Sequence, residues 1–589
     1  MSVDIEDRLV AAEADGPGGR APIRGPGVLA RLWALPVAAH SAVLLVVLVA
    51  LLPFVGTSGI FSADEGAAIV QARQLARGDG WVTPYAFTRI DPQQRAFPLE
   101  LSDPGRGGFA PFAKHPAYAL VLAGADRAGG VTAMFVLSAL GTAVAALFGG
   151  LLAARCHPSI ARPALWVVGL ASPLLFDSYL LIAHALGAAC VAGATWAALR
   201  YVDDRRWWHL VGMTVALCGA AALRTEALLF AGALGGVLVG LGIGRRATGP
   251  MVAGLGAWAA AAAVKVVEPR IVTILIGTPT VTSRNSSHIV SHGVLDDRWN
   301  AFVTTWLRPS YGAFERGAAL LVPLACLVVA GALLARRRPS DTSGLVVISG
   351  LVVATSALIV LFGADTVPGL VVAFPLLLAG FLVTRRSDLV ATTPRVLFLV
   401  SIAFAALVLA TEYRVGGSGE WGGRYFAIGL PVACPYALFA LRGVGTRLDA
   451  RSCRFALVAV VASCAALSIL GLRVLRANHE RSASNAALAA RVSARTDPGD
   501  GGPPVIVTNE AVLPRAMWRS FPNRRLLLTP RGRVGEYLRR VDGAGVAELT
   551  FATRDPRLDL GRLGSPYRVV RVVRLGRGTG WRYAVLRSP

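Results

Sequence analysis

The acidic pair Asp64 and Glu65 stands a few residues after the first long apolar stretch of the chain, residues 37–56. A carboxylate just outside a bilayer is hydrated enough to stay ionised and close enough to meet a lipid headgroup. Such a group can accept a proton from a substrate held at the membrane surface. Asp64 is therefore our first candidate for a catalytic base, with Glu65 beside it.

The residues around this pair also predict the start of a helix. Ser62 can serve as the N-cap, and Glu65, three residues later, completes a capping box. We expect the helix to run to Arg77, since Gly78 supplies a stop signal, and to lie on the membrane surface. The residues that share its apolar face are Ile69, Ala72, Leu75 and Ala76. The cap accounts for Glu65 and leaves Asp64 as the stronger catalytic candidate.

Positively charged candidates follow on the same outer loop. Lys114 is one of only two lysines, and it stands with His115 just before an apolar stretch that is too short to cross a membrane. A cation there could hold the phosphate of a lipid, with His115 as a neighbouring substrate contact. An ordinary interfacial lysine that reaches up to the headgroups is the alternative.

A glycine-rich segment, residues 412–425, ends in a second group of candidates. Arg424 can grip a phosphate with two parallel hydrogen bonds, and Trp421 and Tyr425 beside it are candidate substrate contacts. A flexible turn with interfacial aromatic residues would explain the same pattern. Arg224 is a further phosphate-binding candidate, although a local ion pair with Glu226 accounts for it equally well.

The histidines are weaker candidates. His288 and His292 are four residues apart, with Asp296 and Asp297 downstream, but no second ligand pair supports a metal site there. His184 lies inside an apolar segment, where an ionisable side chain is either functional or hydrogen-bonded between helices. We retain His184 as a possible substrate contact, assign no metal ligands and leave a divalent metal open.

The composition decides the class of protein. The chain has 589 residues, of which 54% are hydrophobic and only 16% charged, far below the charge of an ordinary soluble domain of about 25%. The mean hydropathy is +0.57. We expect an α-helical polytopic membrane protein. The thirteen predicted spans cover residues 37–56, 131–154, 162–176, 178–199, 207–222, 225–244, 249–267, 315–335, 343–363, 366–384, 394–411, 425–441 and 454–473.

Orientation follows from the arginines. Alternate short loops are rich in Arg and the loops between them are nearly free of it, so the Arg-rich side is assigned to the cytoplasm. Residues 1–36 then form a disordered cytoplasmic tail and residues 37–474 a membrane domain. Its exported loops are residues 57–130, 268–314 and 412–424. None of the seven cysteines falls in an exported loop, so no disulfide framework is predicted.

Residues 475–589 change character. Alternating stretches such as residues 504–507 and 567–573 predict a small soluble α/β domain outside the membrane. It contributes much of the net charge of +24, which suits an anionic lipid or wall polymer, although an Arg-rich composition alone would also produce it. Nucleic acid is not an expected partner on that side of the membrane.

The order of these features resembles the GT-C superfamily of membrane glycosyltransferases, which includes protein O-mannosyltransferases, aminoarabinose transferases and mycobacterial arabinosyltransferases. The resemblance rests on short motifs in chain order. They are Asp64-Glu65, residues 71–78, residues 114–116, residues 172–175 and residues 421–425. It implies a polyprenyl-phosphate sugar donor, an acidic base in the first outer loop and a cationic pocket for the carrier phosphate. His115 and His184 depart from the family pattern, which commonly has a proline and an acid there.

We therefore expect an inverting glycosyltransferase in the cytoplasmic membrane, with its active site outside. It would move a sugar from the polyprenyl-phosphate donor to a hydroxyl group of an envelope glycan, lipid or protein. Two other functional classes remain as alternatives. A lipid or polysaccharide transporter or flippase would place charges near the bilayer midplane, often in repeated halves. A non-catalytic wall-assembly scaffold would need none of the outer-loop charges.

Overall fold

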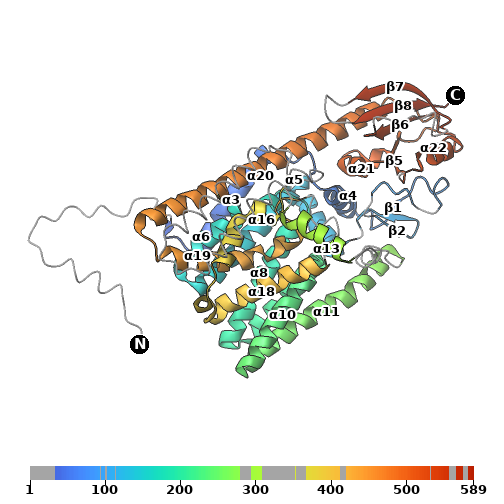
Figure 1. Cartoon of the computed structure of the whole chain (residues 1–589). Helices are drawn as coiled ribbons and strands as arrows, with labels where there is room; N and C mark the ends of the chain where they lie inside the picture. Colours follow the sequence, from blue (N-terminus) through green and yellow to red (C-terminus); the bar gives the residue numbers. More distant parts are fainter. Residues whose placement is uncertain are drawn as a thin grey trace, which may run out of the picture.

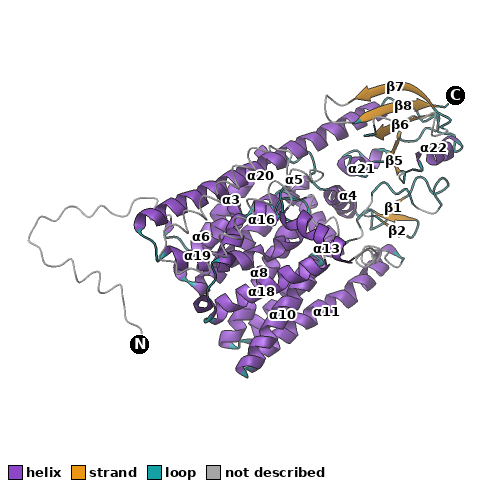
Figure 2. Ribbon diagram, viewed as in Figure 1, coloured by secondary structure: helices purple, strands orange, loops and turns teal. Residues whose placement is uncertain are grey.

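The structure is a computed structural model that describes residues 33–92, 95–99, 102–112, 114–278, 294–307, 352, 367–411, 420–530, 532–555, 565–574 and 581–588. It is mostly helical, with a small sheet region at the C-terminal end (Figures 1 and 2). Seven of the described helices are long and apolar enough to cross a membrane, and the chain is thus a multi-pass membrane protein. They are α3 (Val37–Val55), α5 (Pro116–Cys156), α8 (His184–Asp204), α10 (Glu226–Arg245), α18 (Thr392–Thr411), the segment Arg424–Gly445 and α20 (Ala450–Ser493).

Several predicted spans are close to the observed helices. The helices α3, α10 and α18 match their predicted spans to within a few residues, as does the shorter α9 (Trp207–Leu223). The predicted spans at residues 315–335 and 343–363 lie outside the described residues, apart from Val352. The total of thirteen spans therefore stays a prediction.

Prolines and glycines interrupt other predicted spans. Residues 162–176 form α6 (Ala161–Trp166), a π-helical turn (Val167–Ala171) and α7 (Leu174–Asp177), broken at Ser172 and Pro173. Residues 366–384 form α16 (Leu370–Ala373) and α17 (Pro375–Leu382). A proline lacks the N–H group that a continuous helix needs and keeps the preceding residue out of the helical region. Hydropathy counts these apolar stretches as single spans, because it does not register such breaks.

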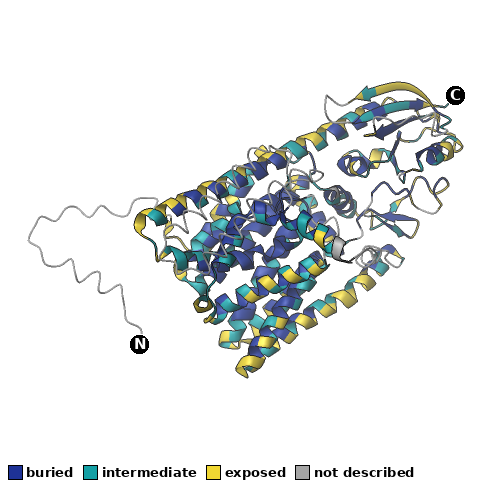
Figure 3. Ribbon diagram, in the orientation of Figure 1, coloured by how far each residue is buried: buried dark blue, intermediate teal, exposed yellow. Residues whose placement is uncertain are grey.

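Other helices are longer than predicted. The apolar stretch after His115, too short by itself to cross a membrane, is part of α5, which bends at Gly129 and Gly130 before it continues as a span. The helix α11 (Thr248–Ile276) extends nine residues past its predicted end at residue 267. Large apolar side chains on α11 and α20 are exposed, as lipid-facing residues would be (Figure 3).

The first outer loop forms its own small structure. The predicted capping box is confirmed, and α4 (Ala63–Arg77) ends at Gly78 in the left-handed conformation. After it comes an antiparallel sheet with strand order β1-β3-β2, formed by β1 (Thr83–Pro84), β2 (Asp103–Gly105) and β3 (Gly108–Ala110). The expectation that α4 lies on the membrane surface is wrong, because Ile69 and Ala72 are buried against protein. An amphipathic pattern fits either kind of apolar partner.

The C-terminal region is the predicted α/β domain. Its mixed sheet has the strand order β5-β4-β6-β8-β7, in which β5, β4 and β6 are parallel and β8 is antiparallel to both of its neighbours. The strands are β4 (Val505–Thr508), β5 (Arg525–Leu528), β6 (Glu548–Thr553), β7 (Arg568–Arg574) and β8 (Arg582–Arg587). The helices are α21 (Val512–Ala516) and α22 (Val534–Asp542). No flexible linker separates the C-terminal domain from the membrane domain. The helix α20 is 44 residues long and continues across the predicted boundary at residue 474.

The C-terminal domain packs directly against the first outer loop. Tyr537 Oη donates a hydrogen bond of 3.1 Å to Asp91 Oδ1, and Leu528 N donates one of 3.2 Å to Ala96 O. The two backbones approach closely at Gly66 in α4, where an added Cβ atom would lie 2.2 Å from the carbonyl oxygen of Arg515. The two units thus form one body that carries the first turn of α4.

We predict that Gly66→Ala disturbs this body, since a Cβ atom there must push α4 and α21 apart. Overpacking of this kind costs about 1–3 kcal/mol in the free energy of unfolding. The melting temperature of the detergent-solubilised protein should fall. The matched control is Gly124→Ala in α5, where an added Cβ atom meets no atom within 4 Å. Equal melting temperatures for the two variants would contradict the close packing.

Candidate active site

Asp64 lies where three distant segments of the chain meet. Arg424 Nη2 donates a hydrogen bond of 2.6 Å to Asp64 Oδ2, and Lys114 Nζ lies 3.9 Å from the same oxygen. Asp64 is on the first turn of α4, Lys114 comes just before α5, and Arg424 opens the 3₁₀ helix η6 (Arg424–Gly429). The structure thus brings together the carboxylate and the two cations that the sequence singled out separately.

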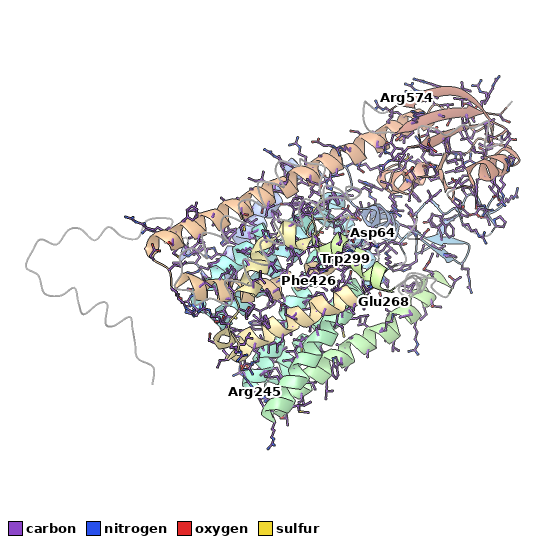
Figure 4. The ribbon with its side chains drawn as sticks, in the orientation of Figure 1. Asp64, Arg245, Glu268, Trp299, Phe426 and Arg574 are labelled. Carbon is purple, nitrogen blue, oxygen red and sulfur yellow. The ribbon has the colours of Figure 1, made fainter. Side chains whose placement is uncertain are left out.

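This cluster lies between the membrane helices and the C-terminal domain. Figure 4 shows Arg245, the last residue of α10, at the end of the molecule opposite Arg574, with Asp64 between them. The side chains of Asp64, Lys114 and Arg424 are 16%, 29% and 20% exposed. They are shielded from bulk water but within reach of a ligand.

The two cations control the ionisation of Asp64. Burial works against its charged form, but the charges of Arg424 and Lys114 outweigh burial and hold the pKa of Asp64 well below its usual range. Burial lowers the pKa of Lys114, and the charge of Asp64 works against that effect. The resting site therefore contains an ionised carboxylate whose basicity is suppressed by its partners.

Glu65 has a different environment from Asp64. It is fully buried, and its Oε2 accepts hydrogen bonds of 2.5 Å from Ser62 N and 2.8 Å from Phe61 N. Its Oε1 accepts one of 2.9 Å from Leu181 N. Burial raises the pKa of Glu65 to about 7. Glu65 therefore fixes the start of α4 against the segment before α8, which favours the capping role over a catalytic one.

His115 directly precedes α5, and Arg224 lies between α9 and α10. His115 Nδ1 lies 3.1 Å from Glu268 Oε1, and its Nε2 lies 3.3 Å from Thr225 Oγ1. Arg224 Nε donates a hydrogen bond of 3.0 Å to Glu226 Oε2, and its Nη2 donates to the other oxygen of the same carboxylate. Arg224 is thus already paired in a fork, which favours the local ion pair over direct phosphate binding.

The aromatic candidates differ in accessibility. Trp421 is buried, stacks against Phe176 with ring centroids 6.0 Å apart, and packs on Gly471. This burial favours a packing role for Trp421 over a direct contact with substrate. Tyr425 is half-buried, and the guanidinium of Arg424 lies 5.9 Å from its ring centre. Tyr425 therefore remains available to a ligand that approaches Arg424.

His184 belongs to a buried group with two acids. His184 Nδ1 lies 3.4 Å from Glu420 Oε2 and 3.9 Å from Asp177 Oδ1. Both ring nitrogens of His184, Asp177 Oδ2 and Glu420 Oε2 lack hydrogen-bond partners among the described residues. Glu420 Oε1 also lies 3.4 Å from Arg424 Nη1, so this group adjoins the Asp64 cluster.

These three side chains could hold a metal ion. Each offers one ligand atom, and these atoms all lie within 4.8 Å of one another. Two ligands of a tetrahedral zinc ion with bonds of about 2.1 Å stand roughly 3.4 Å apart, so small movements would suffice. The histidine pair His288 and His292 lies outside the described residues, as do the side chains of Asp296 and Asp297.

Sequence reasoning assigned no role to Asp177 or Glu420. Asp177 ends an apolar segment seven residues before His184. Glu420 lies among glycines, far after His184 in the sequence. An acid in an apolar segment is itself a functional signal, and this signal could have identified Asp177. Nothing local to Glu420 indicates that it meets His184.

The comparisons with known proteins bear on the fold. No family model and no curated protein sequence matches the chain. The structure of ArnT from Cupriavidus metallidurans in the apo state matches with a TM-score of 0.50 and 16% identity, over 95% of this chain and 98% of that one. The structure of the same protein bound to undecaprenyl phosphate matches with a TM-score of 0.49 and 15% identity, over 95% of this chain and 98% of that one. The archaeal oligosaccharyltransferase AglB from Archaeoglobus fulgidus, in complex with an inhibitory peptide and a dolichol-phosphate, matches with a TM-score of 0.49 and 12% identity. This match covers 89% of this chain and 69% of that one.

The likeness to apo ArnT extends over nearly the whole length of both chains, including the C-terminal domain. At this level of identity it concerns the fold, which does not by itself fix an activity. The protein shares the fold of ArnT from Cupriavidus metallidurans, a multi-pass helical domain followed by a small C-terminal domain.

Proposed function

We propose that the protein is an inverting glycosyltransferase of the cytoplasmic membrane. It transfers a sugar from a polyprenyl-phosphate donor to a hydroxyl group of an envelope glycan, lipid or protein on the outer face. The observation that supports this most directly is the contact of Asp64 with Arg424 and Lys114. A proton acceptor and two phosphate-binding cations in one place are what this reaction requires. ArnT, whose fold the chain shares, has been crystallised with undecaprenyl phosphate.

The resting ion pair suggests how the donor prepares the base. A phosphate group that binds Arg424 and Lys114 competes with Asp64 for their positive charge. Because these charges hold the pKa of Asp64 down, their engagement by phosphate raises it. Asp64 therefore becomes a stronger base when the donor is in place.

The transfer itself is a single displacement. The acceptor oxygen forms a bond to the anomeric carbon while the bond from that carbon to the phosphate oxygen breaks. Asp64 takes the acceptor proton, and the polyprenyl phosphate departs as an anion that Arg424 and Lys114 stabilise. The half-buried Tyr425 borders the place where the phosphate would bind.

The arrangement of charge also bears on the rival classes. Asp64, Lys114 and Arg424 contact one another, and Figure 4 shows Asp64 at the end of the helical domain that is nearer to the C-terminal domain. A transporter would be expected to concentrate charged or broken segments at the bilayer midplane. A scaffold would have no use for a carboxylate kept ionised between two cations. We therefore retain the enzyme as the proposal.

A divalent metal ion fits the group formed by Asp177, His184 and Glu420. The mixed set of one imidazole and two carboxylates suits zinc or manganese. A bound ion would satisfy buried polar atoms that otherwise lack partners, and it would fix Glu420 and hence the loop that carries Arg424. We propose that such a metal ion stabilises the structure of the site.

The central prediction concerns Asp64. Asp64→Asn removes the proton acceptor at constant size and should lower turnover on the order of 10² to 10⁴-fold. Glu65→Gln should cost far less turnover and should lower the melting temperature, because it weakens the cap of α4. The assay is transfer by purified protein from a polyprenyl-phosphate sugar to a synthetic acceptor. A folded Asp64→Asn protein with near-normal turnover would falsify the assignment of Asp64 as the base.

A second prediction concerns the donor phosphate. Lys114→Ala and Arg424→Ala should each weaken the binding of undecaprenyl phosphate about tenfold or more, since a charge-assisted hydrogen bond contributes about 1.5–3 kcal/mol. Arg424→Lys should stay impaired, because lysine cannot form the planar fork. Arg571→Ala, on the exposed strand β7, is the matched control. Unchanged affinity in both Ala variants would remove these residues from the site.

The metal prediction can be tested without an activity assay. The purified protein should contain about one equivalent of zinc or manganese by elemental analysis, and a chelator should lower its melting temperature. Glu420→Gln should lose the ion, whereas Glu480→Gln, at an exposed position on α20, should keep it. A metal-free protein whose melting temperature does not respond to added zinc or manganese would exclude the site.

A further inference from the structure

A second site lies between the first outer loop and the C-terminal domain. A cavity of about 480 Å³ is lined on one side by the second half of α4 and the segment that follows it, and on the other side by residues 518–526. The helices α4 and α21 lie side by side next to it (Figure 1). The volume falls within the range of small-molecule sites, about 300–1,000 Å³.

Arginine side chains give the cavity an excess of positive charge. Its lining includes Arg73, Arg77, Arg524 and Arg525, against a single acid, Asp79. Arg525 is paired with Asp500, and Arg73 Nε lies 3.7 Å from Asp126 Oδ1. The other two arginines have no carboxylate partner among the described residues. Arg77 and Arg524 therefore present uncompensated charge to the cavity.

Arg524 is held rigidly in this position. Its Nε donates a hydrogen bond of 3.0 Å to Ser493 Oγ, and its other nitrogens donate to the carbonyl oxygens of Asn523 and Ala490. These partners are neutral, so they orient the guanidinium without cancelling its charge. A fixed guanidinium loses little freedom when it binds an anion.

The remaining walls are aromatic with a few polar groups. Tyr85, Phe87 and Phe521 line the cavity, and Trp518 lies under the guanidinium of Arg73 at 4.8 Å. Trp518 Nε1 is buried and has no hydrogen-bond partner among the described residues, and Gln74 adds a polar group. Such walls suit a ligand that has both apolar faces and polar edges.

We propose that this cavity binds an anionic saccharide and is the acceptor subsite of the enzyme. A sugar ring offers apolar faces to the aromatic walls and hydroxyl groups to the polar ones. A carboxylate or phosphate group on the chain would meet Arg77 and Arg524. This inference deepens the proposed function and rests on it.

The position of the cavity fits an extended acceptor. Arg73 and Asp64 are nine residues apart on the same helix, which corresponds to about 14 Å along its axis. Nine residues are two and a half helical turns, so the two side chains leave opposite faces of α4, and a chain of a few sugar rings in the cavity would bend around the helix to place its far end at Asp64. A wall of the cavity belongs to the C-terminal domain, so the subsite exists only while that domain is docked on α4.

Titration calorimetry on the full-length protein in neutral-lipid nanodiscs tests the proposal. The probes are two matched pairs: trigalacturonate with its methyl ester, and phosphorylated mannotriose with unphosphorylated mannotriose. At least one anionic probe should bind about tenfold more tightly than its neutral partner, since a charge-assisted hydrogen bond is lost with the charge. Arg77→Gln and Arg524→Gln should each remove that preference, and Arg571→Gln on β7 should retain it. Arg77 is exposed, so its variant avoids the folding risk of Arg524→Gln.

Several outcomes would overturn the proposal. They are no binding of any probe at 10 mM, equal binding of the charged and neutral partners, and a preference that survives both substitutions. Displacement of the probes by phosphatidylglycerol in the nanodisc would identify a lipid headgroup site instead. Undecaprenyl-phosphate binding should be normal in Arg77→Gln and Arg524→Gln and weakened in Arg424→Ala. A loss of donor binding only in Arg424→Ala, without saccharide binding, would reject the acceptor subsite and leave the proposed function standing.

Discussion

The ion pair between Asp64 and Arg424 joins side chains 360 residues apart in the sequence, and the surrounding structure serves to bring them together. A partly buried ion pair adds little to the stability of the fold unless neighbouring groups hold its geometry, because both charged groups lose hydration. That support comes from both sides. Glu65 fixes the first turn of α4, and Glu420 contacts the guanidinium from the loop that carries Arg424.

The C-terminal domain is part of this support. It packs on α4 at Gly66, where only a residue without a side chain permits the approach of the Arg515 backbone. The 44-residue helix α20 joins it to the membrane helices without a flexible linker, and Tyr583 of the sheet donates a hydrogen bond to Asn485 of that helix. The segment that carries α4 is thus held by the membrane helices on one side and by the C-terminal domain on the other.

The sequence predicted the features that depend on local physics. The capping box at Ser62 and Glu65 needs only neighbouring residues, and the runs of β-branched residues in β4 and β7 favour strands by themselves. The expectation that α4 lies on the membrane surface was wrong, because an apolar helix face can pack equally well against lipid or against protein. The contact of His184 with Glu420, 236 residues later, depends on how distant segments pack, and no spacing in the sequence encodes that.

The position of α4 suggests why the site and the cavity occur together. Its first turn carries Asp64, and its second half lines the cavity with Arg73 and Arg77. A helix is stiff along its axis, so a ligand held at one end has a defined distance to the other. Orientation of a bound acceptor relative to the base is a large part of catalysis. The same helix would then set both the proton acceptor and the distance over which the acceptor chain must reach it.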